Sequence, residues 1–231
     1  MNIITWNMQG SNATTENKWN AGVKNILQSI SPRPIVCLQE CGRVPPSGHH
    51  YTRLPFAINE DEVDFVDVYQ WGGTQYRPGY WVFIHHWDTG ANRVNTAIVT
   101  KVPPDDFGTG VALIQPTGEV TWRPALGIQL GEEWIFSFHA ISPNGPDAPG
   151  LIDAVWRSYP YWYIGADWNQ QPDDLVLPDG IVKCPPDLNT HSVANAVNKY
   201  DYVIRSGGDQ VVGARLSGLI MSDHYAVGYG F

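Results

Sequence analysis

Apolar residues along this chain fall mostly in short blocks of about four to eight residues, contiguous or alternating with polar ones, which is typical of β-strands. The expected strands span residues 2–7, 35–39, 80–85, 96–100, 111–114, 125–130, 134–138, 161–164, 200–204, 211–214 and 226–231. In the acidic segment 60–67, apolar residues alternate with carboxylates, so we favour a half-exposed strand there over a charged partner-binding tail. Residues 42–62 and 170–190 are rich in proline and acidic residues and predict loops.

Two segments follow the helical period instead. In the first, the apolar positions are Trp19, Val23, Ile26, Leu27 and Ile30, with Thr14 or Thr15 as the expected N-cap and Ser31-Pro32-Arg33-Pro34 as the end. In the second, they are Leu151, Ile152, Val155 and Trp156, with Asp147 as the expected N-cap and Pro149 in the first turn. Many strands with two helices predict two β layers between helices. No linker-like segment interrupts the chain, so we expect a single domain over residues 1–231.

Composition narrows the classes of function. The chain has 231 residues, 43% of them hydrophobic, and 23 acidic against 14 basic residues, a net charge of −9. A protein that coats nucleic acid through bulk charge would be basic, so phosphate binding here requires a cation or a few placed arginines. The chain opens on a predicted strand without a signal peptide, and no apolar run is long enough to cross a membrane.

The three cysteines do not predict a disulfide framework. Cys37 and Cys41 lie four residues apart in a predicted strand, which separates their Cα atoms by roughly 13 Å, too far for a disulfide. They also lack the second ligand pair of a structural zinc site. We expect Cys184 to be a free, buried thiol, and a link to another chain is the alternative.

Polar residues recur where the predicted strands end. They are Asn7, Glu40, His139, Asp167, Asn169, Asp201, Asp223 and His224. Most of their ligand atoms are oxygens, which favours Mg²⁺ or Mn²⁺ over zinc. Two histidines, each able to pair with a carboxylate, can supply an acid and a base near neutral pH. A hard cation, two imidazoles and some arginines are the groups that phosphoester hydrolysis requires.

Each of these residues also has a structural interpretation. Asp167 and Asn169 point the same way from an extended chain, but Asp and Asn are also common turn residues. A single histidine after a strand is often structural, and we interpret His49-His50 and His85-His86 in that way. Ser222-Asp223-His224 is not a serine triad, because adjacent side chains alternate in direction and cannot align a nucleophile with its base.

Several motifs, taken in order, resemble the endonuclease/exonuclease/phosphatase superfamily of deoxyribonuclease-I type. They are Thr5 to Gly10, Leu38-Gln39-Glu40, His139, Gly165 to Asn169, Tyr200-Asp201-Tyr202 and Ser222-Asp223-His224. Within that superfamily, the chain resembles the catalytic B subunits of cytolethal distending toxins. The residues that carry this narrower resemblance are 5–11, 18–20, 77–78, 90–95, 97–99, 123–128 and 190–191. Short strings such as S-D-H are weak signals alone, whereas an ordered set over nearly the whole chain is specific.

The resemblance implies an α/β fold, a four-layer α/β sandwich in which two packed, mostly antiparallel β-sheets are flanked by helices. It also implies hydrolysis of DNA phosphodiester bonds with Mg²⁺, or with Mn²⁺ in its place. The implied metal ligands are Glu40, Asp223 and Asn7; the implied catalytic residues are His139, Asp167, Asn169, Asp201 and His224; and the implied DNA phosphate-binding residues are Arg77, Arg93 and Arg123. Asp167 and Asn169 would orient the attacking water and the phosphate, and His224 would pair with Asp201.

The chain departs from the family pattern at a few positions. Ala166 and Trp168 stand where the family has Gly and Phe, and Ala226 stands where it usually has Pro. These changes keep the polar residues of each motif. The glutamate that holds the first histidine in the deoxyribonuclease has no match near Arg77, so the family pattern supplies no partner for His139.

Three functions are compatible with the sequence. The first is a DNA endonuclease of the toxin B-subunit type, which the resemblance links to separate delivery subunits, to secretion and to delivery into the nucleus of target cells. The second is a phosphoinositide phosphatase, which would use the same metal and histidines. The third is a catalytically inactive binding subunit, which the complete set of polar strand ends disfavours.

Overall fold

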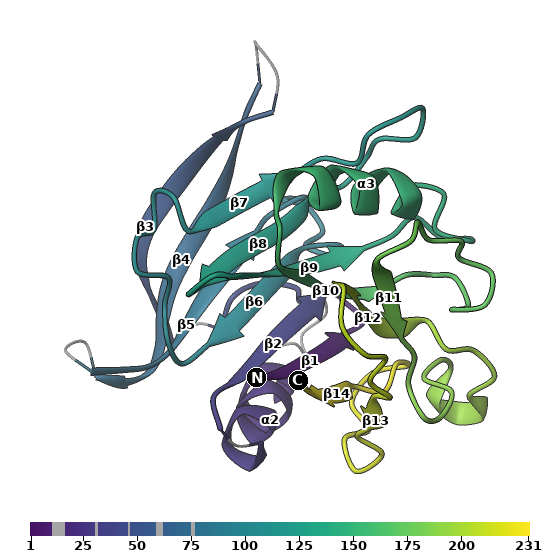
Figure 1. Cartoon of the computed structure of the whole chain (residues 1–231). Helices are drawn as coiled ribbons and strands as arrows, with labels where there is room; N and C mark the ends of the chain where they lie inside the picture. The colour runs from purple at the N-terminus through teal and green to yellow at the C-terminus, as the bar shows by residue number, and fades with distance from the viewer. Residues whose placement is uncertain (11–16, 31, 46, 59–61, 75–76) are drawn as a thin grey trace.

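The computed structural model describes residues 1–231 except 11–16, 31, 46, 59–61 and 75–76, and gives only the backbone of residues 74, 77 and 78. Within this part of the chain, the strands form two mixed sheets, one of eight strands and one of six (Figure 1). The strand order is β13-β14-β1-β2-β6-β5-β4-β3 in the first sheet and β11-β12-β10-β9-β8-β7 in the second.

The larger sheet combines the two ends of the chain with its first third. Its strands are β1 (Asn2–Asn7), β2 (Pro34–Gln39), β3 (Gly48–Ala57), β4 (Val63–Thr74), β5 (Arg77–His85), β6 (Thr96–Thr100), β13 (Ala214–Arg215) and β14 (Val227–Gly230). The smaller sheet contains β7 (Val111–Ile114), β8 (Ala125–Leu130), β9 (Glu133–His139), β10 (Trp162–Asp167), β11 (Ile181–Cys184) and β12 (Asp201–Ser206). The helical segments are η1 (Lys18–Val23), α2 (Lys24–Ser29), α3 (Ala148–Ser158) and η2 (Val193–Asn195).

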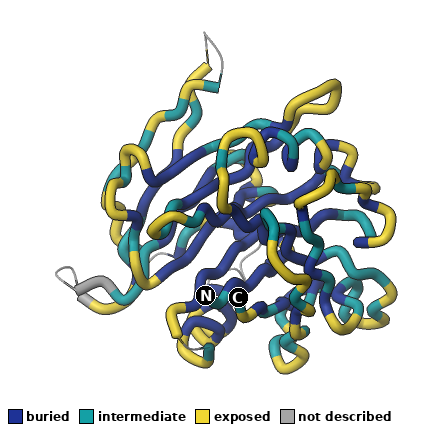
Figure 2. Tube along the Cα trace, viewed as in Figure 1, coloured by how far each residue is buried: buried dark blue, intermediate teal, exposed yellow. Residues whose placement is uncertain are grey.

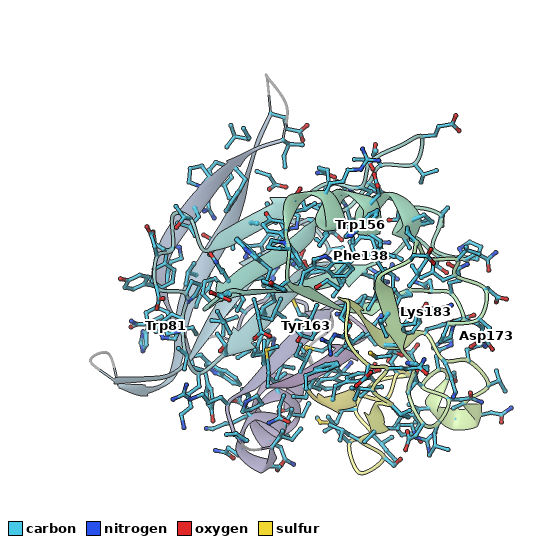
Figure 3. All side chains as sticks on the ribbon, viewed as in Figure 1. Trp81, Phe138, Trp156, Tyr163, Asp173 and Lys183 are labelled. Atoms are coloured by element: carbon cyan, nitrogen blue, oxygen red, sulfur yellow. The ribbon has the colours of Figure 1, made fainter. Side chains whose placement is uncertain are left out.

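Three apolar clusters hold four layers together, as the resemblance implied. Between the sheets lie buried residues of both, among them Ile3, Phe83 and Ile135. A second cluster joins the outer face of the smaller sheet to α3, and a third joins the outer face of the larger sheet to η1 and α2. The central strands are therefore buried on both faces, as the dark blue segments of Figure 2 show. Figure 3 shows Phe138 beneath α3, whereas Trp156 of that helix is 45% exposed and does not extend its apolar stripe into the core.

Each sheet contains one parallel pair at its centre. β1 runs parallel to β2, with Asn7 opposite Gln39, and β9 runs parallel to β10, with His139 opposite Asp167. Because all other pairs among the described strands are antiparallel, only in these two pairs do the carboxyl ends of neighbouring described strands lie side by side. This arrangement explains why polar residues follow these strands in the sequence.

The two parallel pairs pack closely and form hydrogen bonds with one another just below these carboxyl ends. Gly165 of β10 faces β1 and β2 so closely that a Cβ atom there would lie 3.1 Å from the Cβ of Cys37 and 3.3 Å from that of Thr5. Gln39, fully buried, donates from Nε2 to the Gly165 carbonyl (3.2 Å) and to Ser137 Oγ (3.1 Å) of the opposite sheet. These bonds satisfy buried polar groups and fix how the strand ends of the two sheets face each other.

Some sequence expectations were wrong in detail. β3 lies within residues 42–62 and β11 within 170–190, both expected as loops, and residues 211–213 are not part of a strand. The expected N-caps Thr14 and Thr15 lie outside the described residues, and the first helix opens as a π-helical turn. Asp147 stands at the N-cap of α3, but its Oδ1 accepts the Ile141 N–H (2.9 Å) rather than capping the helix.

None of the helices described is long and apolar enough to cross a membrane. All three cysteines are buried and free of disulfides. Burial raises the pKa of the Cys37 thiol to about 12 and also raises the pKa of Cys184, which makes both poor nucleophiles in the folded protein.

Candidate active site

Asn7 links the two sheets at their shared edge. Its side chain, 1% exposed, donates from Nδ2 to Asp167 Oδ2 (2.8 Å) and approaches Glu40 Oε1 (3.3 Å). Its own Oδ1 accepts the backbone N–H of Gln9 (2.9 Å). One amide from β1 therefore lies between a carboxylate that follows β2 and a carboxylate that ends β10.

Glu40 has an unusual backbone conformation for its residue type. Its φ is +46°, in the left-handed region that side chains with a Cβ rarely adopt. The Glu40 carbonyl accepts the Gly10 N–H (2.9 Å), and the side chain remains about 25% exposed. Strain of this kind persists where the surroundings enforce it, often at functional sites. Here it holds the carboxylate at the strand edge, facing solvent on one side and Asn7 on the other.

His224 belongs to a buried network with two carboxylates. Its Nδ1 lies 2.8 Å from Asp201 Oδ2, and its Nε2 lies 3.7 Å from Asp167 Oδ2 and 4.0 Å from Asp223 Oδ1. The segment is anchored to β1, because Ser222 Oγ donates to the Asn7 carbonyl (2.7 Å). The expected pairing of His224 with Asp201 is therefore present.

His139 lies on the other side of Asp167. Its Nε2 is 3.6 Å from Asp167 Oδ2 and 3.8 Å from Glu40 Oε1. Its Nδ1 is 2.9 Å from Nη1 of Arg123, whose Nη2 donates to the Ala140 carbonyl (3.2 Å). A guanidinium can only donate, so Nδ1 accepts and the single ring proton of neutral His139 lies on Nε2. Arg123 thus occupies the place where the family resemblance left His139 without a partner.

Asp167 and Asn169 form a turn whose two polar side chains lie in the cluster at the strand edge. Asp167 Oδ1 accepts the Asn169 backbone N–H (3.0 Å), and Asn169 adopts a φ of +49°, which is a turn. The Asn169 amide donates to the Ala140 carbonyl (2.9 Å), beside His139. Trp168 points into the core under α3, as the alternation predicted. The turn therefore supplies two polar side chains at the strand edge.

The surroundings of the clustered titratable groups shift their pKa values in different directions. Burial raises the pKa of Asp167 to about 6 and also raises the pKa of Glu40. Burial, together with the charges of Arg123 and His224, lowers the pKa of His139 well below its usual value. Burial would also lower the pKa of His224, but the carboxylates of Asp201 and Asp167 outweigh it and raise that pKa to about 10. The two imidazoles thus differ at neutral pH, His139 neutral and His224 protonated.

The three arginines expected to bind DNA phosphate differ in how far they are buried and in what they contact. Arg123 is buried (7% exposed) and bonded to His139, whereas Arg93 is exposed, in a turn where its backbone N–H reaches Asp88 Oδ2 (3.3 Å). The side chain of Arg77 lies outside the described residues. Contact of any of these arginines with DNA phosphate stays a prediction.

Two residues near the site have no signal in the sequence that assigns them a role. Lys18 is 5% exposed, and its ammonium group bonds the carbonyls of Met8 and Gln9 while it faces the charges of Glu40 and Asp223. Burial lowers its pKa, and those two carboxylates oppose the shift. His191 packs against His224, with ring centroids 4.5 Å apart. Both lie in segments that carry the resemblance to toxin B subunits, 18–20 and 190–191, and the fold places them beside the cluster.

The cluster contains a candidate metal site. Ligand atoms of Asp167, Asp201 and His224, all buried, lie within 4.8 Å of one another, and Oδ1 of Asp201 is buried without a hydrogen-bond partner among the described residues. Glu40 and Asp223 add two carboxylates that are partly exposed. This donor set consists mainly of hard oxygens, which suits a divalent cation. The residues present therefore fit a divalent cation held mainly by oxygen ligands.

Two mixed sheets packed face to face, with carboxylates, amides and two histidines gathered beside the ends of their central strands, are typical of the phosphoesterases of deoxyribonuclease-I-like fold. The chain belongs to the Endonuclease/Exonuclease/phosphatase family, whose model matches residues 4–224.

Known relatives place the chain more narrowly. It is 30% identical over 247 residues to a Salmonella typhi homologue of the B subunit of cytolethal distending toxin, across 98% of this chain and 88% of the relative. Its structure resembles the cytolethal distending toxin of Haemophilus ducreyi with a TM-score of 0.81 and 27% identity, covering 99% of this chain and 96% of that one. The toxin of Actinobacillus actinomycetemcomitans gives a TM-score of 0.80 and 26% identity, with 99% and 97% covered.

Proposed function

We propose that this chain is a Mg²⁺-dependent endonuclease that hydrolyses DNA phosphodiester bonds, of the cytolethal distending toxin B-subunit type. The observation that carries the proposal is the placement of Asp167 between two imidazoles, one neutral (His139) and one protonated (His224). Asp167 Oδ2 lies 3.6 Å from Nε2 of His139 and 3.7 Å from Nε2 of His224. The similarity to toxin B subunits over nearly the whole chain supports the choice of DNA as substrate.

Glu40, Asp223 and Asn7 would hold the Mg²⁺ ion, with Mn²⁺ as a substitute. Their oxygen atoms are hard ligands, and the Glu40 and Asp223 carboxylates face solvent, where a phosphate can enter. When bound, the ion neutralises charge that develops on the phosphate oxygens. Burial raises the pKa of Glu40 and of Asp167, and a bound cation would favour the ionised form of both carboxyl groups.

Two side chains of the protein carry out the two proton transfers, one as the base and one as the acid. Asp167, with a pKa of about 6, is ionised at neutral pH and accepts a proton from the attacking water, whose oxygen forms the new bond to phosphorus. His224, with a pKa of about 10, carries a proton on Nε2 and gives it to the leaving oxygen as the phosphorus–oxygen bond breaks. Two groups whose environments push their pKa values apart are the usual signature of such a pair.

His139 and Asn169 would position the phosphate. Neutral His139 donates from Nε2 toward the space shared with Asp167 and Glu40, so it can stabilise negative charge on a phosphate oxygen. The Asn169 amide lies beside it, held by the Ala140 carbonyl. Arg93, on the exposed turn, and Arg77 would contact flanking DNA phosphates, which would offset the acidic net charge locally.

We further propose that the protein acts with separate delivery subunits, is secreted and reaches the nucleus of a target cell. The support is its similarity to the crystal structure of a cytolethal distending toxin. Co-purification with candidate subunits encoded with it, against a control of unrelated carrier proteins, tests this part alone.

Plasmid nicking with Mg²⁺ tests the main proposal. His139→Ala and His224→Ala should each reduce nicking by about 10²–10⁴-fold, with unchanged circular dichroism. His49→Ala, an exposed histidine of β3, is the matched control and should retain wild-type activity. Unchanged nicking by both site variants would refute the proposal. A preference for phosphatidylinositol trisphosphate over plasmid would support a phosphatase instead, and calorimetry without Mg²⁺ binding or turnover would support an inactive subunit.

A further inference from the structure

Beside the oxygen-rich ligands stands a second, nitrogen-rich group. Its members are His191, Asp223 and His224, whose ligand atoms lie within 4.8 Å of one another. The Asp223 carboxylate lies between the two rings, with Oδ2 4.0 Å from Nε2 of His191 and Oδ1 4.0 Å from Nε2 of His224. These separations are too long for hydrogen bonds, which end near 3.2 Å. Ligand atoms held tetrahedrally at about 2.0–2.1 Å from Zn²⁺ lie roughly 3.3–3.4 Å apart, so small side-chain shifts would bring these atoms to coordination distance.

The backbone holds His191 at this position. His191 forms antiparallel bridges with His224 and with Asn198, and the neighbouring Thr190 carbonyl accepts the Tyr225 N–H (2.9 Å). The His191 ring is packed between His224, at 4.5 Å, and Tyr200, at 5.5 Å. Its side chain is about 30% exposed, so Nε2 can be reached from solvent and the ring can turn by the small amount that coordination requires.

His224 supplies the second, independent indication of a ligand. It is 6% exposed, its Nδ1 is fixed by Asp201 at 2.8 Å, and within the described part of the chain its Nε2 makes no hydrogen bond. A buried imidazole whose far nitrogen is held by a carboxylate is the usual arrangement of a metal-binding histidine, because the carboxylate fixes the tautomer and the ring orientation. This Nε2 lies 3.7 Å from Asp167 Oδ2 and 4.0 Å from Asp223 Oδ1, beyond hydrogen-bond distance of either.

We infer that His191, Asp223 and His224 form a second divalent-cation site, which shares Asp223 with the proposed Mg²⁺ ligands and takes Zn²⁺. Two imidazoles and one carboxylate suit Zn²⁺ far better than Mg²⁺, which prefers oxygen ligands and retains its waters. If the chain is the endonuclease proposed above, Zn²⁺ bound at this site would inhibit it. Zn²⁺ on the Nε2 lone pair of His224 excludes the proton that this nitrogen would donate to the leaving oxygen, and it also engages Asp223.

Zinc binding, measured by titration calorimetry with Mg²⁺ in excess, tests the site without reference to activity. His191→Asn should weaken Zn²⁺ binding at least tenfold, and His191→Phe should do the same while preserving ring packing against His224 and Tyr200. His49→Asn is the control and should bind Zn²⁺ as the wild type does. Anomalous scattering at the zinc edge from soaked crystals should place the ion between the three side chains.

Nicking assays then test the inhibitory role. In metal-clean buffer with Mg²⁺, His191→Asn should nick plasmid within about threefold of wild type, and the Zn²⁺ concentration for half-inhibition should rise at least tenfold. Equal Zn²⁺ binding by wild type and both His191 variants, or no Zn²⁺ binding by wild type, would overturn the inference. If the wild type binds Zn²⁺ through His191 but fails to nick DNA with Mg²⁺, the site stands and the proposed endonuclease function fails.

Discussion

Nη1 of Arg123 lies 2.9 Å from Nδ1 of His139, and both side chains are buried. The donor-only guanidinium leaves Nδ1 as an acceptor, so His139 presents an Nε2–H to Asp167 and Glu40. In a protein of net charge −9, one of its few cations is thus used to select a histidine tautomer inside the site.

We therefore predict that Arg123→Met lowers kcat of plasmid nicking by on the order of 10²-fold, because His139 then samples both neutral tautomers. Nitrogen NMR of the His139 ring should show mixed protonation of Nδ1 and Nε2 in the variant and Nε2 protonation alone in the wild type. Arg93→Met, on the exposed turn, should instead raise KM and reduce the salt dependence of binding. A rise in KM alone for Arg123→Met, with an unchanged ring spectrum, would assign Arg123 to phosphate contact only.

The pH dependence of nicking should report the separated pKa values. Activity should rise as Asp167 loses its proton near pH 6, remain level, and fall as His224 loses its proton near pH 10. Burial lowers the pKa of His224 and Asp201 raises it, so Asp201→Asn should move the alkaline limb down toward the ordinary imidazole value of about 6.5. Asp153→Asn, in an exposed pair with Arg157, should leave the profile unchanged. An unshifted alkaline limb in Asp201→Asn would remove His224 as the proton donor.

The raised pKa of His224 also affects stability. A histidine whose pKa is raised by folding stabilises the folded protein below its unfolded pKa, and this contribution is lost as the pH rises through the folded pKa. The His224 contribution should therefore be complete below about pH 6.5 and absent above about pH 10. Urea unfolding between these limits should show that the wild type loses more stability than Asp201→Asn does.

The close contact between the sheets gives a separate prediction. Gly165→Ala would place a Cβ 3.1 Å from Cys37 and 3.3 Å from Thr5, both on the facing parallel pair. Because neither neighbour can move without shifting its strand, we expect a loss of stability of about 1–3 kcal/mol in urea unfolding. Gly218→Ala is the matched control, since a Cβ there meets nothing within 4 Å. Equal stability of the two variants would mean that the sheets can separate locally at no cost.

The sequence predicted the central strands well, and the physical reason is their burial. β6 and β8, both inside their sheets, begin and end where the apolar blocks do, because strands covered on both faces read as nearly uninterrupted apolar runs. β3 was missed because it lies at the edge of the larger sheet and alternates between exposed and half-buried residues, with Pro55 within it. Such a strand resembles a polar loop in composition.

The site was predictable where its residues stand at a predicted strand end or in a family motif. Asn7, Glu40, His139 and Asp167 follow the two parallel pairs, so the pattern alone gathers them at one edge. Lys18, His191 and the bond from Arg123 to His139 depend on how distant segments pack, which no local pattern encodes. The sequence likewise left His139 without a partner because the guanidinium comes from the segment before β8, not from the position that the family pattern indicates.

Asp67, far from the site in the chain, should be the main acid-sensitive support of the strands β3 and β4. Its buried carboxylate accepts two bonds from Arg53 (2.8 and 2.7 Å) and lies 3.1 Å from Nε2 of His50. Burial raises its pKa, but Arg53 and His50 outweigh burial and hold the pKa below its usual value. A carboxyl with a lowered pKa stabilises the folded state above its unfolded pKa and loses that contribution as the pH falls through the folded pKa.

We therefore expect Asp67→Asn to cost about 1–3 kcal/mol of unfolding free energy at pH 7, because the hydrogen-bond donors of Arg53 and His50 lose a charged acceptor. The difference from wild type should shrink below about pH 4, as the wild-type carboxyl itself becomes protonated. Asp153→Asn, which breaks an exposed pair one helical turn long, should cost less than about 0.5 kcal/mol at every pH. A difference between Asp67→Asn and wild type that stays constant from pH 7 to pH 3 would show that the side chain acts through packing and that its charge contributes nothing.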